Sequence, residues 1–196
     1  MKLAKKLNLS FFGEHGLFIQ NRELDTIFKL EVQEFMKKNP DTDFNFSGNI
    51  EEILSVLNSQ TVFSAFPLLT DDICQQLLVF SHLTSAENFN LRLQIVKNNK
   101  CKKFHTDITD YRMLCTYKGP ATIYLDPENM ITESQIENPS PDIIRYANQG
   151  DVMIFAGALA EGDLTPVYHK SPEVSDEDSY RLLLKIDTNT ISKWYK

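Results

Sequence analysis

The chain has 196 residues, 42% of them hydrophobic and 24% charged, so it is long enough for one domain with a sizeable core and too apolar for a disordered protein. Its net charge of −7 argues against nucleic acid as the main partner, because that binding needs a basic surface. No apolar run approaches the roughly 20 residues that span a bilayer, and three scattered cysteines are not a disulfide framework, so we expect no membrane partner and a cytoplasmic location.

The first part of the chain has the periodicity of helices. Three segments repeat apolar residues at helical spacing: RELDTIFKLEVQEFMKK (22–38), NIEEILSVLN (49–58) and TDDICQQLLVFSHLT (70–84). Asn49 and Glu52 resemble a capping pair at the start of the second segment, and Thr70 is expected to cap the third. We therefore predict that residues 1–88 form a helical region packed on the rest of the protein.

From residue 89 the pattern changes to the alternation typical of strands. In FNLRLQIV (89–96), apolar residues alternate with polar ones, which indicates a half-buried strand. Four later segments also read as strands: 111–117, 121–125, 150–157 and 180–187. Many short antiparallel strands close into a barrel or a two-sheet jelly roll. The predicted fold is therefore mainly β with N-terminal helices (α+β), in which residues 89–196 form a double-stranded β-helix, or cupin-like jelly roll, within one compact domain.

Candidate functional residues gather in this second part. His105 and Asp107 stand two residues apart in FHTD, so on one strand both side chains would point to the same face. His169 follows in VYHKSP, and Arg181 begins the last strong strand. Two histidines and one carboxylate leave open positions on a metal, an arrangement that suits non-haem Fe(II) with a co-substrate and oxygen. An arginine deeper in the barrel can hold a carboxylate through two parallel hydrogen bonds.

The order of these segments resembles the prolyl-hydroxylase branch of the Fe(II)/2-oxoglutarate-dependent dioxygenases. That branch has an HxD strand, a Gly-x-x-Thr hairpin, a Gly-Asp strand, a His-x-x-x-Pro-like segment and a basic residue further on. The residues that match after HxD are Gly119 with Thr122, Gly150 with Asp151, and His169 with Arg181. CKKFHTD, RMLCTYKGPAT, HKSP and RLLLKID also resemble a narrower, uncharacterised family of bacterial proteins, mainly from proteobacteria and often encoded near zinc-homeostasis genes.

The resemblance implies roles for individual residues. The implied metal ligands are His105, Asp107 and His169, with no catalytic residue beyond them. Arg181 is implied to bind the distal carboxylate of 2-oxoglutarate, and either Tyr117 or Tyr124 to contact the same co-substrate. Many such dioxygenases have Ser or Thr two residues after the arginine. Leu183 occupies that position here, so another acid in place of 2-oxoglutarate stays an alternative.

Each residue also has an ordinary structural interpretation. Asp107 could cap a turn, His169 could pair with the acidic loop at 173–179, and Arg181 could form a surface ion pair with Asp176 or Glu177. Their joint order favours one metal site over these separate explanations. Cys101 would complete a tetrahedral zinc set if it shared the strand face of His105, but the turn-forming residues around it favour a turn.

Two functions follow from these observations. The first is an oxidoreductase, an Fe(II)/2-oxoglutarate-dependent dioxygenase that hydroxylates a small-molecule or protein substrate, which the sequence does not identify. The alternative is a non-catalytic jelly-roll protein that binds zinc or iron in metal homeostasis. Arg181 distinguishes the two, because an oxygenase needs a cation for its co-substrate acid and a plain zinc site does not.

Overall fold

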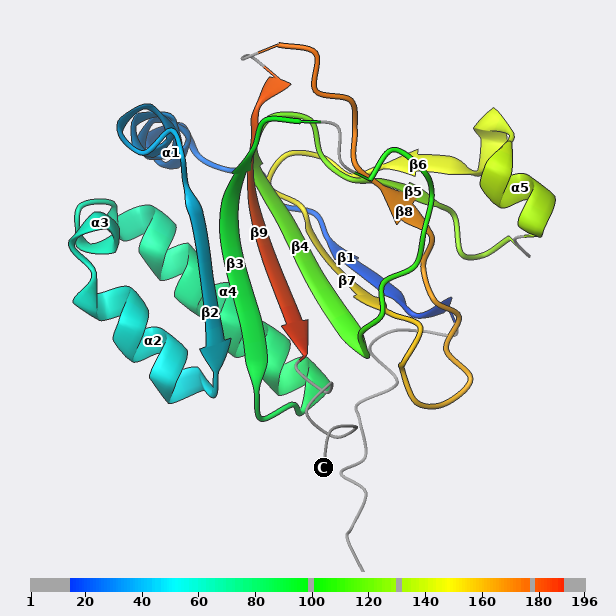
Figure 1. Cartoon of the computed structure of the whole chain (residues 1–196), viewed down its shortest axis with the longest axis horizontal. Coiled ribbons are helices and arrows are strands. Elements are labelled where there is room, and N and C mark those ends of the chain that lie inside the picture. The colour runs from blue at the N-terminus through cyan, green and yellow to red at the C-terminus, as the bar shows by residue number, and fades with distance from the viewer. Residues whose placement is uncertain (1–14, 99–100, 130–131, 177–178, 189–196) are drawn as a thin grey trace, which may run out of the picture.

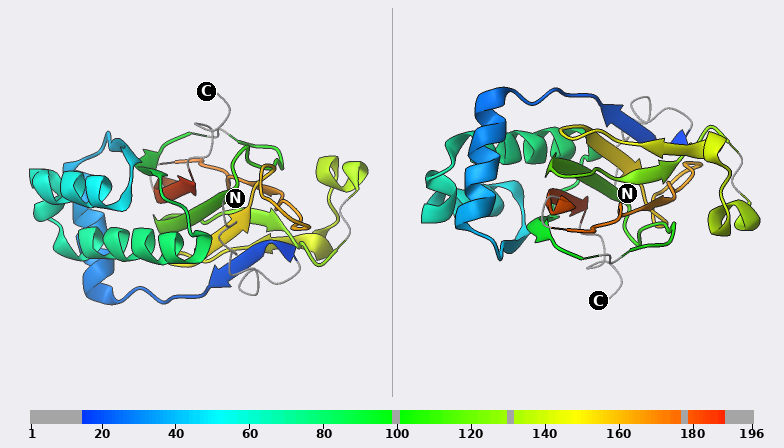
Figure 2. Two further views of the ribbon diagram at one scale, coloured as in Figure 1. Left: turned by 90° about the horizontal axis from the view of Figure 1, so that it is seen from below. Right: turned by 90° about the horizontal axis from the view of Figure 1, so that it is seen from above.

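The computed structural model of the chain describes residues 15–98, 101–129, 132–176 and 179–188 (Figure 1). It contains a six-stranded sheet, a three-stranded sheet and a layer of helices on one face of the larger sheet (Figure 1, Figure 2). Every pairing between the described strands is antiparallel. The prediction of a mainly antiparallel sheet fold with several helices is confirmed, whereas the finer jelly-roll assignment and the division at residue 88 stay predictions.

Four helices come from the first part of the chain and form the helical layer. They are α1 (Thr26–Lys38), α2 (Ile50–Ser59), α3 (Thr61–Ser64) and α4 (Pro67–Thr84). The capping pair predicted for α2 is present, because the side chains of Asn49 and Glu52 bond each other's backbone N–H. No helix among the described residues is long and apolar enough to cross a bilayer.

The start of α4 differs from the prediction. Thr70 does not cap the helix but lies inside it, where its hydroxyl donates to the carbonyl oxygens of Phe63 and Phe66. The helix begins one turn earlier, at Pro67. A proline suits the first helical position, because its fixed φ is already helical and its missing N–H would have had no partner there. The proline was therefore the boundary signal, not the threonine.

The larger sheet combines strands from both parts of the chain. Its order is β1 (Leu17–Gln20), β7 (Val152–Ala156), β4 (Tyr111–Lys118), β9 (Arg181–Thr188), β3 (Phe89–Val96) and β2 (Asp43–Gly48). The two edge strands β1 and β2 lie in the region predicted to be helical, and this is a difference from the prediction. They form because strands from the second part of the chain give them partners.

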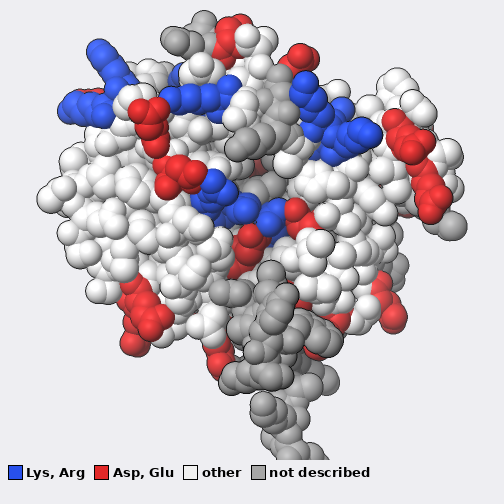
Figure 3. Space-filling view, viewed as in Figure 1, with Lys and Arg blue, Asp and Glu red and all other residues white. Residues whose placement is uncertain are grey.

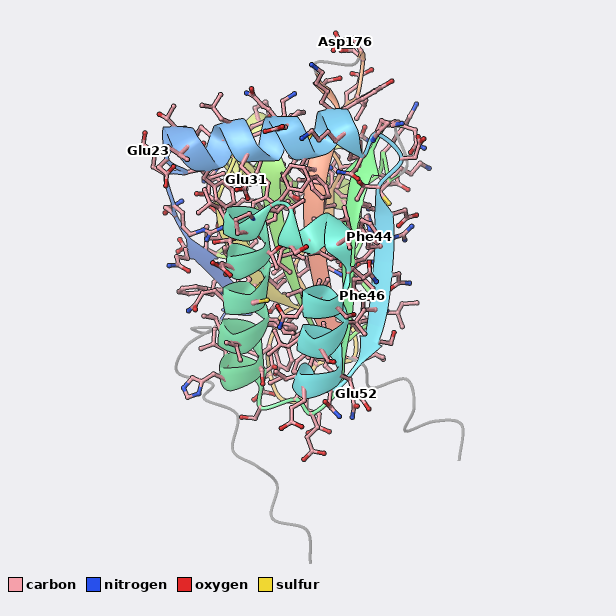
Figure 4. All side chains as sticks on the ribbon, turned by 90° about the vertical axis from the view of Figure 1, so that its left-hand side faces the viewer. Glu23, Glu31, Phe44, Phe46, Glu52 and Asp176 are labelled. Atoms are coloured by element: carbon pink, nitrogen blue, oxygen red, sulfur yellow. The ribbon has the colours of Figure 1, made fainter. Side chains whose placement is uncertain are left out.

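The two faces of the larger sheet have different neighbours. Alternate residues of its central strands, such as Leu91, Met113 and Leu184, pack against the helices in the main hydrophobic core. Figure 4 shows this helical side, with Phe44 and Phe46 of β2 labelled; both rings lie against the ring of Phe63 in α3. The opposite face of the sheet is free of these helices (Figure 2).

The smaller sheet covers part of that opposite face. Its order is β6 (Ile144–Tyr146), β5 (Ile123–Leu125) and β8 (His169–Lys170), and the short helices at Glu133–Glu137 (α5) and Pro141–Ile143 precede β6. Tyr124 of the smaller sheet packs with Leu114 and Leu183 of the larger one in a second apolar cluster. The contact holds β8 over β4 and β9, beside a cavity that residues of both sheets line.

Candidate metal centre

The three predicted metal ligands converge at one end of this cavity. One donor atom from each of His105, Asp107 and His169 lies within 4.8 Å of the other two. Nε2 of His169 is 3.2 Å from Oδ2 of Asp107, and Nε2 of His105 is 3.8 Å from Oδ1 of the same carboxylate. Asp107 and His169 are buried, whereas the side chain of His105 is 37% exposed and lines the cavity. The cluster can hold one metal ion with its open side toward the cavity.

Backbone carbonyl groups orient both imidazole rings. Nδ1 of His105 donates to the carbonyl oxygen of Lys103 at 3.0 Å, and Nδ1 of His169 donates to that of Val167 at 3.2 Å. A carbonyl oxygen can only accept, so these bonds put the ring proton on Nδ1 and leave the lone pair on Nε2. Both Nε2 atoms face Asp107, and a bond from Nδ1 to a backbone carbonyl is a usual way in which metal-binding histidines are oriented.

His105 and Asp107 do not share a strand, contrary to the prediction. His105 forms an isolated bridge with His169, in which each backbone N–H donates to the other's carbonyl oxygen at 3.0 Å. Asp107 follows in the loop that leads to β4. The bridge ends after one pair because the next residues bond the segment after β7 instead of a strand partner. The three side chains therefore do not converge because of the alternation of side chains along one strand.

The segment after β7 fixes the loop that carries Asp107. The N–H of Ala158 donates to the carbonyl oxygen of Asp107, and the N–H of Gly157 donates to that of Asp110, both at 2.8 Å. Glycine is required at position 157, because a Cβ there would overlap the carbonyl oxygen of Thr109. The close backbone packing makes this loop a fixed support for the carboxylate.

A run of ion pairs connects Asp107 to β9. Arg112 contacts Oδ1 of Asp107, and its Nε and Nη2 donate to the two carboxylate oxygens of Asp187. Burial raises the pKa of the Asp107 carboxyl, but His169 and Arg112 outweigh that effect and hold the pKa below its usual range. Oδ2 of Asp107 has no hydrogen-bond partner among the described residues. The carboxylate is therefore ionised, with Oδ1 held by Arg112 and Oδ2 facing Nε2 of His169, so that a metal ion could be bound by both of these atoms.

Arg181 is a buried cation in the same cavity. It is 1% exposed, and its Nη2 donates to Oγ1 of Thr116 at 3.2 Å and of Thr122 at 3.5 Å. Among the described residues no carboxylate pairs with it and its Nε has no partner, so burial lowers the pKa of Arg181 to about 10. This burial contradicts the alternative of a surface pair with Asp176, and Glu177 lies outside the described residues. A buried charge without a carboxylate partner is destabilising, and an anion bound from solution would compensate it.

The Gly-x-x-Thr hairpin after β4 surrounds this guanidinium. Gly119 has φ 87°, and a Cβ there would lie 2.6 Å from the carbonyl oxygen of Tyr180 and 3.1 Å from Cγ of Arg181. Glycine therefore allows the turn to close against the stem of the arginine. Three residues later, Thr122 brings its hydroxyl to the guanidinium and lines the cavity.

The two tyrosines considered as co-substrate contacts occupy different places. Tyr117 points from β4 toward the helices, where its hydroxyl donates to Oδ2 of Asp72 at 2.7 Å, so the structure does not bring Tyr117 to the site. Tyr124 stands opposite His169 in the pairing of β5 with β8 and packs in the apolar cluster that contains Leu183. Its contact with a co-substrate stays a prediction.

The cavity itself has a volume of about 450 Å³, within the usual range of small-molecule sites. Leu183 lines it, as does Cys101. Cys101 is exposed in a loop with φ 40°, as the predicted turn would have it, and its sulfur is not part of the ligand cluster among the described residues.

Sequence reasoning missed Arg112, Thr116 and Asp187. Each lies on the cavity side of its strand. In β4 the even-numbered residues are on that side, and in β9 the odd-numbered residues are. The alternation that puts Arg181 and Leu183 on one face also puts Asp187 there. A charged residue on the inner face of a strand was therefore the signal that could have identified Arg112 and Asp187, whereas Thr116 carries no such signal.

Comparisons with known proteins place the chain in a family and give its fold. A model of the family described as "Protein of unknown function (DUF1826)" matches residues 14–187. None of the curated proteins compared with the chain matches it. HygX from Streptomyces hygroscopicus, solved with iron bound, matches with a TM-score of 0.51 and 8% identity, over 97% of this chain and 88% of HygX.

Two more solved structures are similar to the chain. A bsmA homolog from Methylobium petroleophilum PM1 matches with a TM-score of 0.50 and 10% identity, over 91% of this chain and 90% of the homolog. A prolyl-4-hydroxylase from Pseudomonas putida matches with a TM-score of 0.47 and 10% identity, over 91% of this chain and 95% of the hydroxylase. The last likeness is too loose to carry an argument, and the first two show a shared fold alone.

Proposed function

The chain belongs to the DUF1826 family of proteins of unknown function, and from its site we propose that it is a non-haem Fe(II)/2-oxoglutarate-dependent oxygenase that hydroxylates its substrate. The observation that carries the proposal is Arg181, a buried cation without a carboxylate partner among the described residues, in the cavity that the ligand cluster borders. The fold shared with iron-bound HygX supports an iron site. We further propose that the two facing sheets are the two halves of a jelly roll.

The residues present fit a metal ion. His105, Asp107 and His169 would hold it through two imidazole nitrogens with free lone pairs and one carboxylate oxygen that has no hydrogen-bond partner among the described residues. Two histidines and one carboxylate are the donor set of non-haem Fe(II) oxygenases. When bound, Fe(II) supplies the redox chemistry that couples oxygen and 2-oxoglutarate to hydroxylation of a substrate.

The chain's own residues bind and orient the co-substrate. Arg181 is permanently charged at neutral pH and presents a planar fork, which matches the two oxygens of a carboxylate. Thr116 and Thr122 accept from its Nη2 and so fix the direction of the fork. Leu183 and the apolar cluster behind it exclude water, which strengthens the charge-assisted contact.

The alternative is a non-catalytic protein that binds zinc or iron. Two nitrogens and one oxygen also suit zinc, and this observation favours neither metal. Arg181 separates the two functions. A storage or sensing site gains nothing from an unpaired buried guanidinium, whereas a co-substrate acid makes that guanidinium tolerable.

The test is a titration of metal-free protein that is loaded with Fe(II) under anaerobic conditions and then given 2-oxoglutarate. We expect a metal-to-ligand charge-transfer band, which reports chelation of the keto acid. Arg181→Ala should weaken the affinity about thirty- to several-thousand-fold, since truncating one partner of such a contact costs about 2–5 kcal/mol. Arg181→Lys should recover only part of the loss, because an ammonium is one point of contact.

Lys38→Ala is the matched control for loss of one positive charge. Lys38 is an exposed residue of α1 that pairs with Glu34, and its removal should leave the band and the affinity unchanged. If the wild-type protein binds the metal but shows no band, the oxygenase proposal loses its co-substrate and the metal-binding alternative becomes the better account. Equal affinities of Arg181→Ala and the wild type for 2-oxoglutarate would likewise favour the metal-binding alternative.

A further inference from the structure

The cavity collects positive charge although the chain as a whole is acidic, with a net charge of −7. Six of its lining residues are Lys or Arg, and two are Asp. The six cations are Arg92, Lys97, Arg112, Lys170, Arg181 and Lys185. Figure 3 shows Lys and Arg side chains gathered in the middle of the face that carries the hollow. The local excess is opposite in sign to the whole chain, so it belongs to this site.

Three of these cations already have close carboxylate partners. Arg92 donates to both oxygens of Asp43 at 2.6 Å, Lys97 lies 2.8 Å from Asp41, and Arg112 pairs with Asp187 and with the ligand carboxylate Asp107. The Asp43 and Asp41 side chains are 53% and 92% exposed. Asp43 engages Nε and Nη2 of Arg92, so a second anion would meet the remaining nitrogen, Nη1, of the guanidinium.

Lys185 is much less neutralised. Its Nζ lies 3.6 Å from Oδ2 of Asp187, and both oxygens of that carboxylate already accept hydrogen bonds from Arg112. No other carboxylate pairs with Lys185 among the described residues. The side chain is 22% exposed and lines the cavity, so a small molecule in the cavity can reach it.

Lys185 and Arg92 stand directly opposite each other. They pair across β9 and β3, on the face that looks into the cavity. Like charges directly opposite on neighbouring strands destabilise a sheet. An anion placed against both side chains removes that repulsion and receives two charge-assisted hydrogen bonds.

We propose that Lys185 and Arg92 form a second anion site, which binds the acidic group of the substrate. This rests on the proposed function, in which Arg181 holds 2-oxoglutarate. The substrate is then a small acid with a carboxylate or a phosphate group. Lys185 lies four residues after Arg181 on the same face of β9, so their Cα atoms are about 13 Å apart and the two cations serve different anions. Leu183 stands between them.

The site lies close enough to the ligand cluster for the substrate to reach it. Lys185 contacts Asp187, Asp187 is bonded to Arg112, and Arg112 contacts Asp107. Only two side chains therefore separate the proposed anion site from a metal ligand. A cavity of about 450 Å³ is a volume for a small molecule rather than for a folded partner.

The test is a calorimetric titration with inorganic phosphate and, separately, with acetate. It uses metal-free protein, so that the probe cannot coordinate an ion, and the Arg181→Leu background, which removes the deeper cation. Lys185→Met and Arg92→Met in this background should each weaken binding of the preferred probe about ten- to a hundredfold. Asp43→Asn should tighten it, because Arg92 then has no competing carboxylate. Lys38→Met is the control and should change nothing.

The comparison of the two probes assigns the acid as phosphate or carboxylate. The proposal would be overturned if Lys185→Met and Arg92→Met both left the affinity for the probes unchanged. It would also be overturned if neither phosphate nor acetate bound. Circular dichroism on every variant confirms that the fold is kept. The result is independent of the charge-transfer experiment, so a missing 2-oxoglutarate band with Lys185-dependent anion binding would reject the proposed function alone.

Discussion

Thr116 stands directly opposite Leu183 in the pairing of β4 with β9, and the hydroxyl of Thr116 accepts a hydrogen bond from Arg181 at 3.2 Å. Residue 183, where many of the dioxygenases that the sequence resembles carry Ser or Thr, is a leucine and gives the guanidinium no hydroxyl. Two hydroxyls nevertheless surround it, from Thr116 on the neighbouring strand and from Thr122 in the hairpin. The guanidinium therefore receives its hydroxyl contacts from other segments of the chain.

Leu183→Thr and Leu183→Val form a matched pair that tests this position. The two new side chains have nearly the same shape, so both lose the same packing with the apolar cluster. The threonine adds a hydroxyl beside the place where Arg181 is proposed to hold a carboxylate. We expect the threonine variant to bind 2-oxoglutarate about three- to tenfold more tightly than the valine variant, since one added hydrogen bond gives about 0.5–1.5 kcal/mol. Equal affinities in the charge-transfer titration would contradict a carboxylate at this place.

Metal binding should depend on each member of the ligand cluster. His105→Ala, Asp107→Ala and His169→Ala should each abolish stoichiometric Fe(II) or Zn(II) binding, because two remaining donors do not make a site for a catalytic metal. His82→Ala is the control, since His82 is an exposed residue of α4 on the helical side. Metal content after dialysis gives the measurement, and retained metal in both His105→Ala and Asp107→Ala would end the metal-site assignment.

Removing the buried charge of Arg181 should stabilise the ligand-free protein. A guanidinium without a carboxylate partner is costly to bury, and burial lowers the pKa of Arg181 to about 10. An apolar side chain at this position would avoid that cost. Arg181→Leu should raise the free energy of unfolding by about 1–4 kcal/mol while abolishing 2-oxoglutarate binding. Arg112→Leu should have the opposite effect and lower the free energy of unfolding by about 3–5 kcal/mol. The substitution leaves the carboxylates of Asp107 and Asp187 without the guanidinium that pairs with them. Urea denaturation distinguishes the two outcomes.

Tyr117→Phe should affect stability and not the site. The change removes the hydrogen bond to Asp72, which connects β4 to α4, and should lower the free energy of unfolding by about 1–2 kcal/mol. Because the ring points to the helices, the affinity for 2-oxoglutarate should equal that of the wild type. A loss of affinity in a variant whose fold is intact would show that Tyr117 acts on the cavity after all.

The cysteines should differ in reactivity. Burial raises the pKa of Cys115 to about 12, so almost none of it is thiolate at pH 8, and the fraction grows only as the pH approaches that value. Cys101 is exposed. With iodoacetamide at pH 8, we expect alkylation of Cys101 in the native protein and of Cys115 only after unfolding. Peptide mass spectrometry locates each adduct, and rapid native labelling of Cys115 would mean that the sheet opens at β4.

The sequence was informative where a residue's environment repeats along the chain. Apolar alternation in β3 and helical spacing in α1 follow from one-sided burial, and both elements are present where they were expected. β1 and β2 have weaker patterns, and they exist because β7 and β3 offer them partners from far along the chain. Pairing of this kind depends on tertiary structure, which a local pattern does not contain.

The site divides in the same way. The order of His105, Asp107 and His169 was enough to expect their convergence, although the reason offered for it, a shared strand, was wrong. The roles of Arg112 and Gly157 depend on contacts between segments that are distant in sequence. Such contacts have no signature within any short window of the chain.

The single bridge between His105 and His169 also bears on when the proposed metal site could form. Before β8 reaches its place, His105 and Asp107 are the only two of the three cluster residues that lie near each other, because they are two residues apart in sequence. Closing the long loop between Asp107 and His169 costs conformational entropy. We expect the free energy gained when the two sheets form to offset this cost without an ion. We therefore expect the ligand cluster to be complete only once β8 is in place, and an unfolded chain to hold divalent ions weakly. A bound ion would then stabilise the finished fold by mass action and would not guide the polypeptide toward it.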